Sequence, residues 1–134
     1  MPPYLLSNDA FTEFLRLFLA GELPRAEWNH AAHLAVAAAT IHAGGDIRDR
    51  ILAYNATQGI VSTPEYGYHE TLTRFWVDRI QDLLPALGRQ ATAFDAARAA
   101  VAAFAHRGRL FDHYYSFDLP SNRHARAIYV APDK

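Results

Sequence analysis

Two histidines stand one helical turn apart in the segment WNHAAHLAVAAAT, at His30 and His33. Positions three or four apart share one face of a helix, so both imidazoles lie on the stripe that also carries Ala37 and Ile41. The alanine, leucine and valine residues that follow indicate that this stripe is buried. The ring nitrogens of a buried imidazole need partners, and a divalent transition metal can accept one lone pair from each ring.

His69 is the third candidate metal ligand, because the same spacing aligns it with Leu72 and Trp76 on the apolar face of a later helix. If helices joined by short turns alternate in direction, the helix of His30 and His33 runs parallel to this later one, and both begin at the same end of a bundle. The three imidazoles are then expected to converge on one ion. Three protein ligands leave positions open for water or substrate, as in catalytic metal sites.

The residue types restrict the metal and its chemistry. The chain contains no cysteine, so a transition metal would be bound by His, Asp or Glu side chains. Imidazole ligands suit zinc, iron, copper or nickel. We therefore expect a metal-dependent enzyme that acts on a small molecule, either by hydrolysis or with oxygen. Neutral ligands leave the charge of the ion uncompensated, which favours an anionic substrate.

Three further residues are candidates for catalysis. Glu70 would orient a ligand imidazole or act as a general base on metal-bound water, and the alternative is a surface ion pair with Arg74, one turn later. The segment LFDHYYSF is expected to reach the mouth of the cavity, where Tyr115 would bind or protonate a substrate and His113 would serve as a fourth ligand or a proton relay. Alternatively, these aromatic side chains complete the core and His113 faces water.

The remaining histidines and the C-terminal arginines have structural interpretations. Arg123 and Arg126 are expected to anchor the last helix, with a substrate carboxylate as an alternative partner for either. His42, His106 and His124 fall near helix ends or on polar faces, so we predict that they lie at the surface. These three histidines are therefore left out of the predicted site.

Two other functional classes stay open. In the first, the protein is an enzyme without metal, in which His69 and Glu70 carry proton transfer in an aromatic pocket, as in a small isomerase or cyclase. In the second, it is a non-catalytic helical binding module whose histidines satisfy one another and the backbone. Metal content separates the metal-dependent enzyme from both alternatives.

Length and charge favour a single domain that acts on a small molecule. A chain of 134 residues is long enough for one core, so residues 1–134 are expected to form one helical domain. Thirteen basic and 14 acidic residues give a net charge of −1, which argues against nucleic acid or an anionic membrane as partner. The chain has neither a signal-peptide pattern nor an apolar run of membrane-spanning length, so we expect a cytoplasmic protein. The aromatic C-terminal segment permits a homodimer without requiring one.

Apolar residues recur at helical spacing along most of the chain, and turn residues separate the repeats. We therefore predict an all-α fold, a compact bundle of about five helices followed by a short C-terminal helix. The predicted helices cover residues 9–20, 25–43, 46–57, 68–84 and 92–106, and the short helix begins at Ser121. The candidate ligands then lie in the first two turns of the second helix and the first turn of the fourth.

Four segments, WNHAAHL, GYHETLTRFW, HYYS and ARAIYVAPD, together resemble a group of small bacterial proteins of unassigned function. That group carries a W-x-H-x-x-H-L segment, a Y-H-E-T-x-T segment and a terminal A-R-x-x-aromatic-V-x-P-D segment, and the likeness extends from Trp28 to Asp133. Where tryptophan is expected near the C-terminus, this chain has Tyr129. The resemblance implies no activity, but it implies that ten residues occupy motif positions: Trp28, His30, His33, Tyr68, His69, Glu70, Thr71, Thr73, Tyr115 and Arg126.

Overall fold

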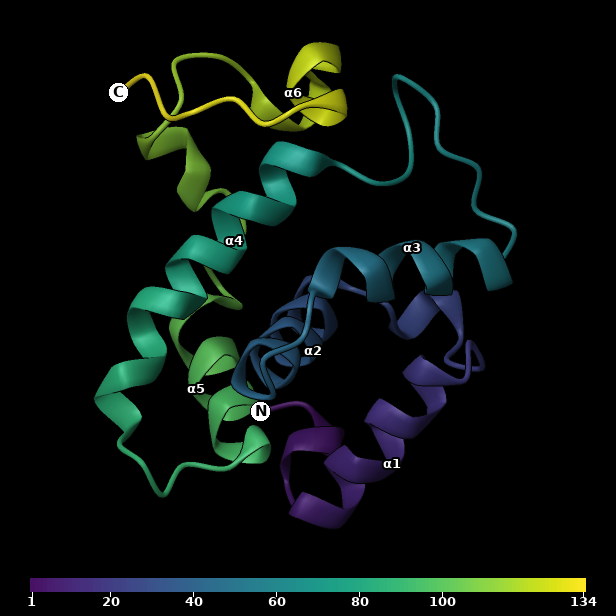
Figure 1. Ribbon diagram of the computed structural model, residues 1–134, viewed down its shortest axis with the longest axis vertical. Helices are drawn as coiled ribbons and strands as arrows, with labels where there is room; N and C mark the ends of the chain where they lie inside the picture. The colour runs from purple at the N-terminus through teal and green to yellow at the C-terminus, as the bar shows by residue number, and fades with distance from the viewer.

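The computed structural model describes residues Met1 to Lys134, and its helices and turns confirm the predicted all-α fold (Figure 1). The α-helices are α1 (Asn8–Leu19), α2 (His30–His42), α3 (Ile47–Thr57), α4 (Glu70–Leu83), α5 (Ala93–Phe104) and α6 (Arg123–Ala127). Short 3-10 helices cover Pro3–Leu5, Arg25–Glu27, Leu84–Leu87, Leu110–His113 and Leu119–Ser121. No helix combines the length and the apolar character needed to cross a membrane.

Side-chain caps fix where several helices begin. The Ser7 hydroxyl caps α1, the Asp46 carboxylate caps α3, and Thr92 caps α5 in a reciprocal pair with Asp95. Each of these groups accepts a hydrogen bond from a backbone amide that has no partner within the helix. All three helices therefore start within one residue of the predicted position.

The two helices that carry the histidines begin later than predicted. A separate 3-10 turn occupies the predicted first turn of α2, so this helix starts only at His30, with Asn29 as its cap. Similarly, α4 starts one residue after His69, which is its N-cap. Of the three candidate ligands, only His33 thus lies inside a helix beyond its first residue.

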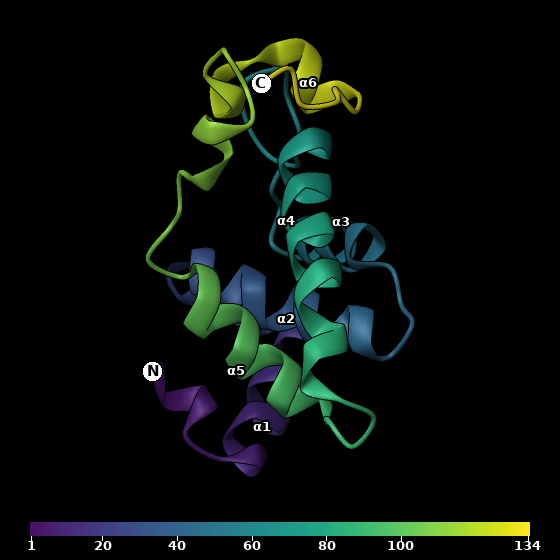
Figure 2. The same cartoon turned by 90° about the vertical axis from the view of Figure 1, so that its left-hand side faces the viewer.

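Alanine-rich α2 and α5 form the centre of the core. They run antiparallel, because the His42 ring donates to the Ala91 carbonyl at 2.7 Å at one end and the His30 ring donates to the Phe104 carbonyl at 3.2 Å at the other. Figure 2 shows α5 packed against α2. Their small side chains let the backbones approach closely, and residues 34–40 of α2 are all buried. Three phenylalanines of α1 complete this core.

The C-terminal segment packs on α4 and forms a second, smaller cluster around Phe75. The Thr71 hydroxyl donates to the Ile128 carbonyl and accepts from the Val130 amide, both at 2.9 Å, which ties the last residues to the start of α4. Figures 1 and 2 show α4 crossing α2 at a steep angle. The parallel arrangement that we expected for these two helices is therefore wrong.

Gly21, directly after α1, allows a close approach that an alanine would prevent. It has a φ of +73°, and an added Cβ would lie 2.4 Å from Thr57 Cγ2 and 2.8 Å from Thr57 Cβ. We predict that Gly21→Ala lowers the free energy of unfolding by about 2 to 4 kcal/mol. Gly44 is the matched control, because its φ is +77° but an added Cβ meets nothing within 4 Å. Gly44→Ala should lower the same quantity by only about 1 kcal/mol, and equal losses in urea unfolding would contradict this account.

Candidate functional site

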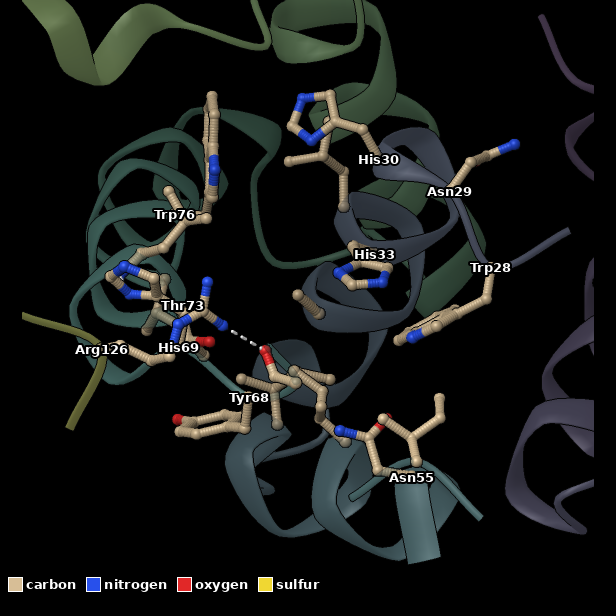
Figure 3. Close-up of a pocket in the computed structure, with 18 of the residues that line it drawn as sticks. Trp28, Asn29, His30, His33, Asn55, Tyr68, His69, Thr73, Trp76 and Arg126 are labelled. Carbon is tan, nitrogen blue, oxygen red and sulfur yellow. Dashed lines mark hydrogen bonds between the residues drawn. The ribbon is translucent and has the colours of Figure 1, made fainter. Parts of the chain in front are cut away.

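A pocket of about 500 Å³ opens between α2, α3, α4 and the loop that joins α3 to α4 (Figure 3). Of its 19 lining residues, 11 are hydrophobic, a composition typical of small-molecule sites. The apolar wall takes residues from one face of each helix, namely Leu34, Ala37, Ile47, Ile51, Leu72 and Val77. Apolar residues at helical spacing in three separate segments thus line a single cavity.

Both tryptophans of the chain line this pocket. The Trp28 ring lies against the His33 ring, with centroids 3.9 Å apart and 34° between the planes, and stacks on Phe18 at 4.5 Å. The Trp76 ring lies 4.9 Å from the His30 ring. Figure 3 shows the two indoles on different walls, so a ligand would meet two large flat apolar surfaces.

His33 presents its imidazole to the pocket, and neither ring nitrogen has a hydrogen-bond partner within the protein (Figure 3). The ring is accessible from the pocket, but protein atoms crowd around it. This desolvation, with a smaller contribution from the charge of His30, lowers the pKa of His33 to about 4. The ring is therefore neutral near neutral pH, and its lone pair is free to accept a proton or a hydrogen bond.

His69 lines the pocket but has no free ring nitrogen. Its Nδ1 accepts a hydrogen bond from the Leu72 amide at 3.0 Å, and its Nε2 donates to the Leu119 carbonyl at 2.9 Å. Burial lowers the pKa of His69, so the neutral form that makes both bonds is favoured. The side chain thus joins the start of α4 to the C-terminal segment, and its lone pair is not available to a metal ion.

The three candidate metal ligands do not converge. His30 lies beside Trp76, two helical turns along α4 from His69, which corresponds to about 10 Å of helix rise. No group of three His, Cys, Asp or Glu side chains is arranged to hold a metal ion. We expected His30, His33 and His69 to lie at the same end of a bundle of parallel helices. This arrangement is wrong, because α4 crosses α2. The metal centre itself stays a prediction.

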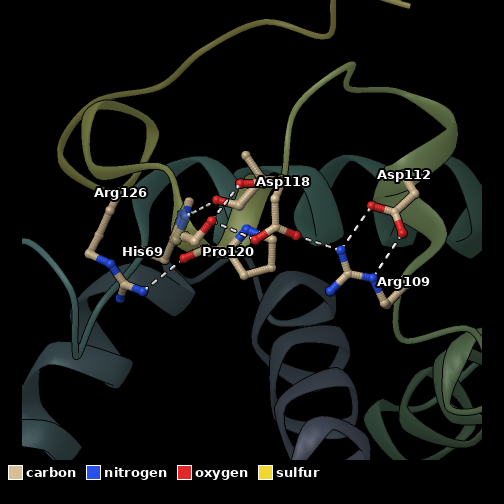
Figure 4. A network of polar contacts seen from close by, with 8 residues as sticks. His69, Arg109, Asp112, Asp118, Pro120 and Arg126 are labelled. Carbon is tan, nitrogen blue, oxygen red and sulfur yellow. Dashed lines mark hydrogen bonds and ion pairs between the residues drawn. The ribbon is translucent and has the colours of Figure 1, made fainter.

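Arg126 is the charged residue of the pocket wall, and its partners are backbone carbonyls. Its guanidinium donates to the Gly67 carbonyl at 2.7 Å and to the Pro120 carbonyl at 3.0 Å. Figure 4 shows the contrast with Arg109, which is held by two carboxylates, those of Asp112 at 2.8 Å and Asp118 at 2.6 Å. Arg126 forms no such ion pair, so its charge is not neutralised by the protein.

Asn55 supplies a second polar group to the pocket. Its residue is only 7% exposed, and its side-chain amide makes no hydrogen bond within the protein. The amide atoms stay accessible from the pocket, so they are free to hydrogen-bond a polar atom of a ligand. The sequence analysis missed Asn55, although its spacing of four residues from Ile51 and eight from Ile47 places it on the same face of α3.

Glu70 points away from this pocket into a neighbouring, more polar one. Its carboxylate lies 3.5 Å from the Arg48 guanidinium and accepts a hydrogen bond from the Tyr68 hydroxyl at 3.1 Å. The ion pair with Arg74 that we considered is wrong, since the Arg74 guanidinium lies 4.2 Å above the Tyr129 ring. Glu70 therefore contacts neither the candidate ligands nor the main pocket.

Tyr115 and His113 also lie outside the pocket lining. Tyr115 is 2% exposed, and its hydroxyl donates to the Val130 carbonyl at 2.8 Å, so it completes the smaller hydrophobic cluster. His113 is exposed at the end of a 3-10 helix. The segment does not cover the cavity mouth because it packs on the Phe75 side of α4.

No protein-family model, curated protein or solved structure matches this chain.

The pocket histidines predict an acid-sensitive fold. Burial lowers the pKa of His30, His33 and His69 below the ordinary 6.5, so the unfolded chain binds protons first as the pH falls. Their stabilising effect is complete above pH 6.5 and is lost toward pH 4, the folded value for His33. We predict that the free energy of unfolding, measured in urea, falls between about pH 7 and pH 5.

His33→Gln should make this pH dependence shallower, because glutamine does not titrate. His124→Gln changes an exposed histidine and is expected to keep the wild-type slope. Identical slopes in the wild type and His33→Gln would contradict the assignment of His33 as a desolvated neutral ring.

Proposed function

We propose that the protein is a metal-free enzyme that binds a small, largely apolar molecule and moves a proton within it, with His33 as the base. The observation that carries this proposal is the neutral, unpartnered imidazole in an apolar pocket. His33 would remove a proton from one atom of the substrate and return it to another, as in an isomerase. No co-reactant is needed, because the proton lost is the proton returned.

The surroundings of His33 support this role. Stacking on Trp28 fixes the ring plane, and a fixed base loses little freedom when the substrate binds. Because most lining residues are hydrophobic, an apolar substrate in the pocket would displace water from around the His33 ring. His69 and Glu70, which the sequence offered as the proton-transfer pair, are less suited, since both already have protein partners.

The motif resemblance is consistent with a functional pocket. Of the ten residues that carry it, only Glu70, Thr71 and Tyr115 are not part of the pocket lining. Most of the likeness to that group of bacterial proteins therefore falls on the wall of one cavity. This supports the pocket, rather than the core, as the feature that the group shares.

The test uses deuterium exchange. Small carbonyl and hydroxy compounds are first screened for binding by tryptophan fluorescence, since both indoles line the pocket. Compounds that bind are then incubated with the protein in heavy water. We predict that deuterium enters a carbon position of the substrate, and that His33→Gln slows this by roughly 100-fold or more while helicity is retained.

His124→Gln, an exposed histidine outside the pocket, is the control and should retain the wild-type rate. The proposal fails if none of the compounds that bind exchanges a proton, or if exchange proceeds unchanged in His33→Gln.

A metal-dependent enzyme is the second candidate, because His30 and His33 line one pocket at a spacing of one helical turn. No third suitable side chain joins them, so further ligands would have to come from water or substrate. Whether zinc, iron, copper or nickel is involved stays open.

Elemental analysis of protein purified without a histidine tag separates the two candidates. The metal-free enzyme predicts only trace metal. One equivalent that is lost in His33→Ala and retained in His124→Ala would favour the metal-dependent enzyme instead.

A further inference from the structure

The geometry points to an organic carboxylate as the substrate class of this pocket, with the carboxylate on Arg126, a second polar group on Asn55 and an apolar body between the two indoles. This inference deepens the proposed function by naming its substrate. It requires that the pocket binds a small molecule, but it does not require that His33 transfers a proton.

The charge of the pocket wall is the first argument. The lining contains no aspartate or glutamate, and Arg126 is its one arginine or lysine. The three lining histidines do not neutralise this charge. Glu70, which follows His69 in the sequence, belongs to the neighbouring pocket and is engaged by Arg48 and Tyr68. A cation beside apolar walls without a counter-ion favours an anionic ligand.

The orientation of the guanidinium is the second argument. The Gly67 and Pro120 carbonyls each accept one of its N–H groups, so the planar group is held in place while its other donors stay free. A fixed guanidinium that binds a carboxylate through two parallel hydrogen bonds loses little side-chain freedom on binding. Carbonyl oxygens orient the cation but leave its net charge intact, unlike the two carboxylates that hold Arg109.

Asn55 is the third argument, and it is independent of charge. Asn55 is 7% exposed, its amide lacks a protein partner and faces the cavity from α3, whereas Arg126 approaches from α6 (Figure 3). A ligand that satisfies both residues must carry two separated polar groups. A carboxylic acid with a carbonyl or hydroxyl group elsewhere on its apolar skeleton meets this condition.

The experiment compares carboxylates with their uncharged amides. The acids 4-oxocyclohexylacetate, 4-hydroxycyclohexylacetate and 4-acetylphenylacetate, which carry a second polar group across an apolar skeleton, are titrated into the full-length protein. Each is compared with its primary amide, and binding is followed by tryptophan fluorescence and by proton–nitrogen NMR spectra. The acid and the amide have nearly the same shape, so the difference between their affinities reports the contribution of the negative charge. We expect saturable binding of at least one acid, roughly tenfold or more tighter than its amide.

Arg126→Gln should remove this preference. It should weaken binding of the acid roughly tenfold or more and leave binding of the amide unchanged. Arg123→Gln is the matched control, because Arg123 lies on the same helix but pairs with Glu65 at the surface. It should preserve the preference. If Arg126→Gln is unfolded by circular dichroism, Arg126→Lys keeps the charge without the planar fork and should retain a reduced preference.

Three results would overturn the inference: no acid of the series binds, acids and amides bind equally, or the preference survives Arg126→Gln in a folded protein. The proposed function fails separately. If the acids bind through Arg126 but no substrate exchanges a proton, the carboxylate site stands and the base assigned to His33 does not.

Discussion

The close contact between α2 and α5 is the interaction on which the rest of the structure depends. Ala96, Ala97 and Ala100 of α5 are fully buried with the alanines of α2, so the two backbones pack without large side chains between them. With α5 along one side of α2, the side that carries His33 is left to α3 and α4. These helices contribute larger isoleucine and leucine side chains, and the space that remains between them is the pocket.

A buried histidine and a half-buried arginine hold one end of this pocket. His69 joins the first turn of α4 to the Leu119 carbonyl, and Arg126 joins the loop at Gly67 to the carbonyl at Pro120. Both contacts connect α4 or the loop before it to the C-terminal segment. The His69 imidazole is neutral, and the Arg126 guanidinium is bound only to carbonyls. Together they hold the pocket wall in place and leave one positive charge on it. Arg126 therefore has a structural role, and the carboxylate site that we propose would give the same side chain a binding role.

The sequence predicts the helices well, because periodicity and caps are local properties. It also identifies His30 and His33 as facing one cavity, since positions three apart share a helix face. It does not predict the crossing of α4 over α2, because the angle between two helices is set by how their side chains interlock in the folded protein. Histidine is not among the common N-cap residues, so His69 was taken for a residue inside the helix. The metal prediction depended on the crossing of the two helices and on the place of His69 at the start of α4, whereas the position of His33 on the pocket face depended on neither.

An anionic ligand would also change what His33 can do. The pocket walls alone lower the pKa of His33 to about 4, and a base that weak has little driving force to accept a proton. The guanidinium of Arg126 would neutralise part of the charge of a bound carboxylate. Any remaining negative charge near the imidazole favours its protonated form and raises its pKa toward the ordinary range. If the substrate is a carboxylate and His33 is the base, as proposed, binding of the substrate would therefore make this base stronger.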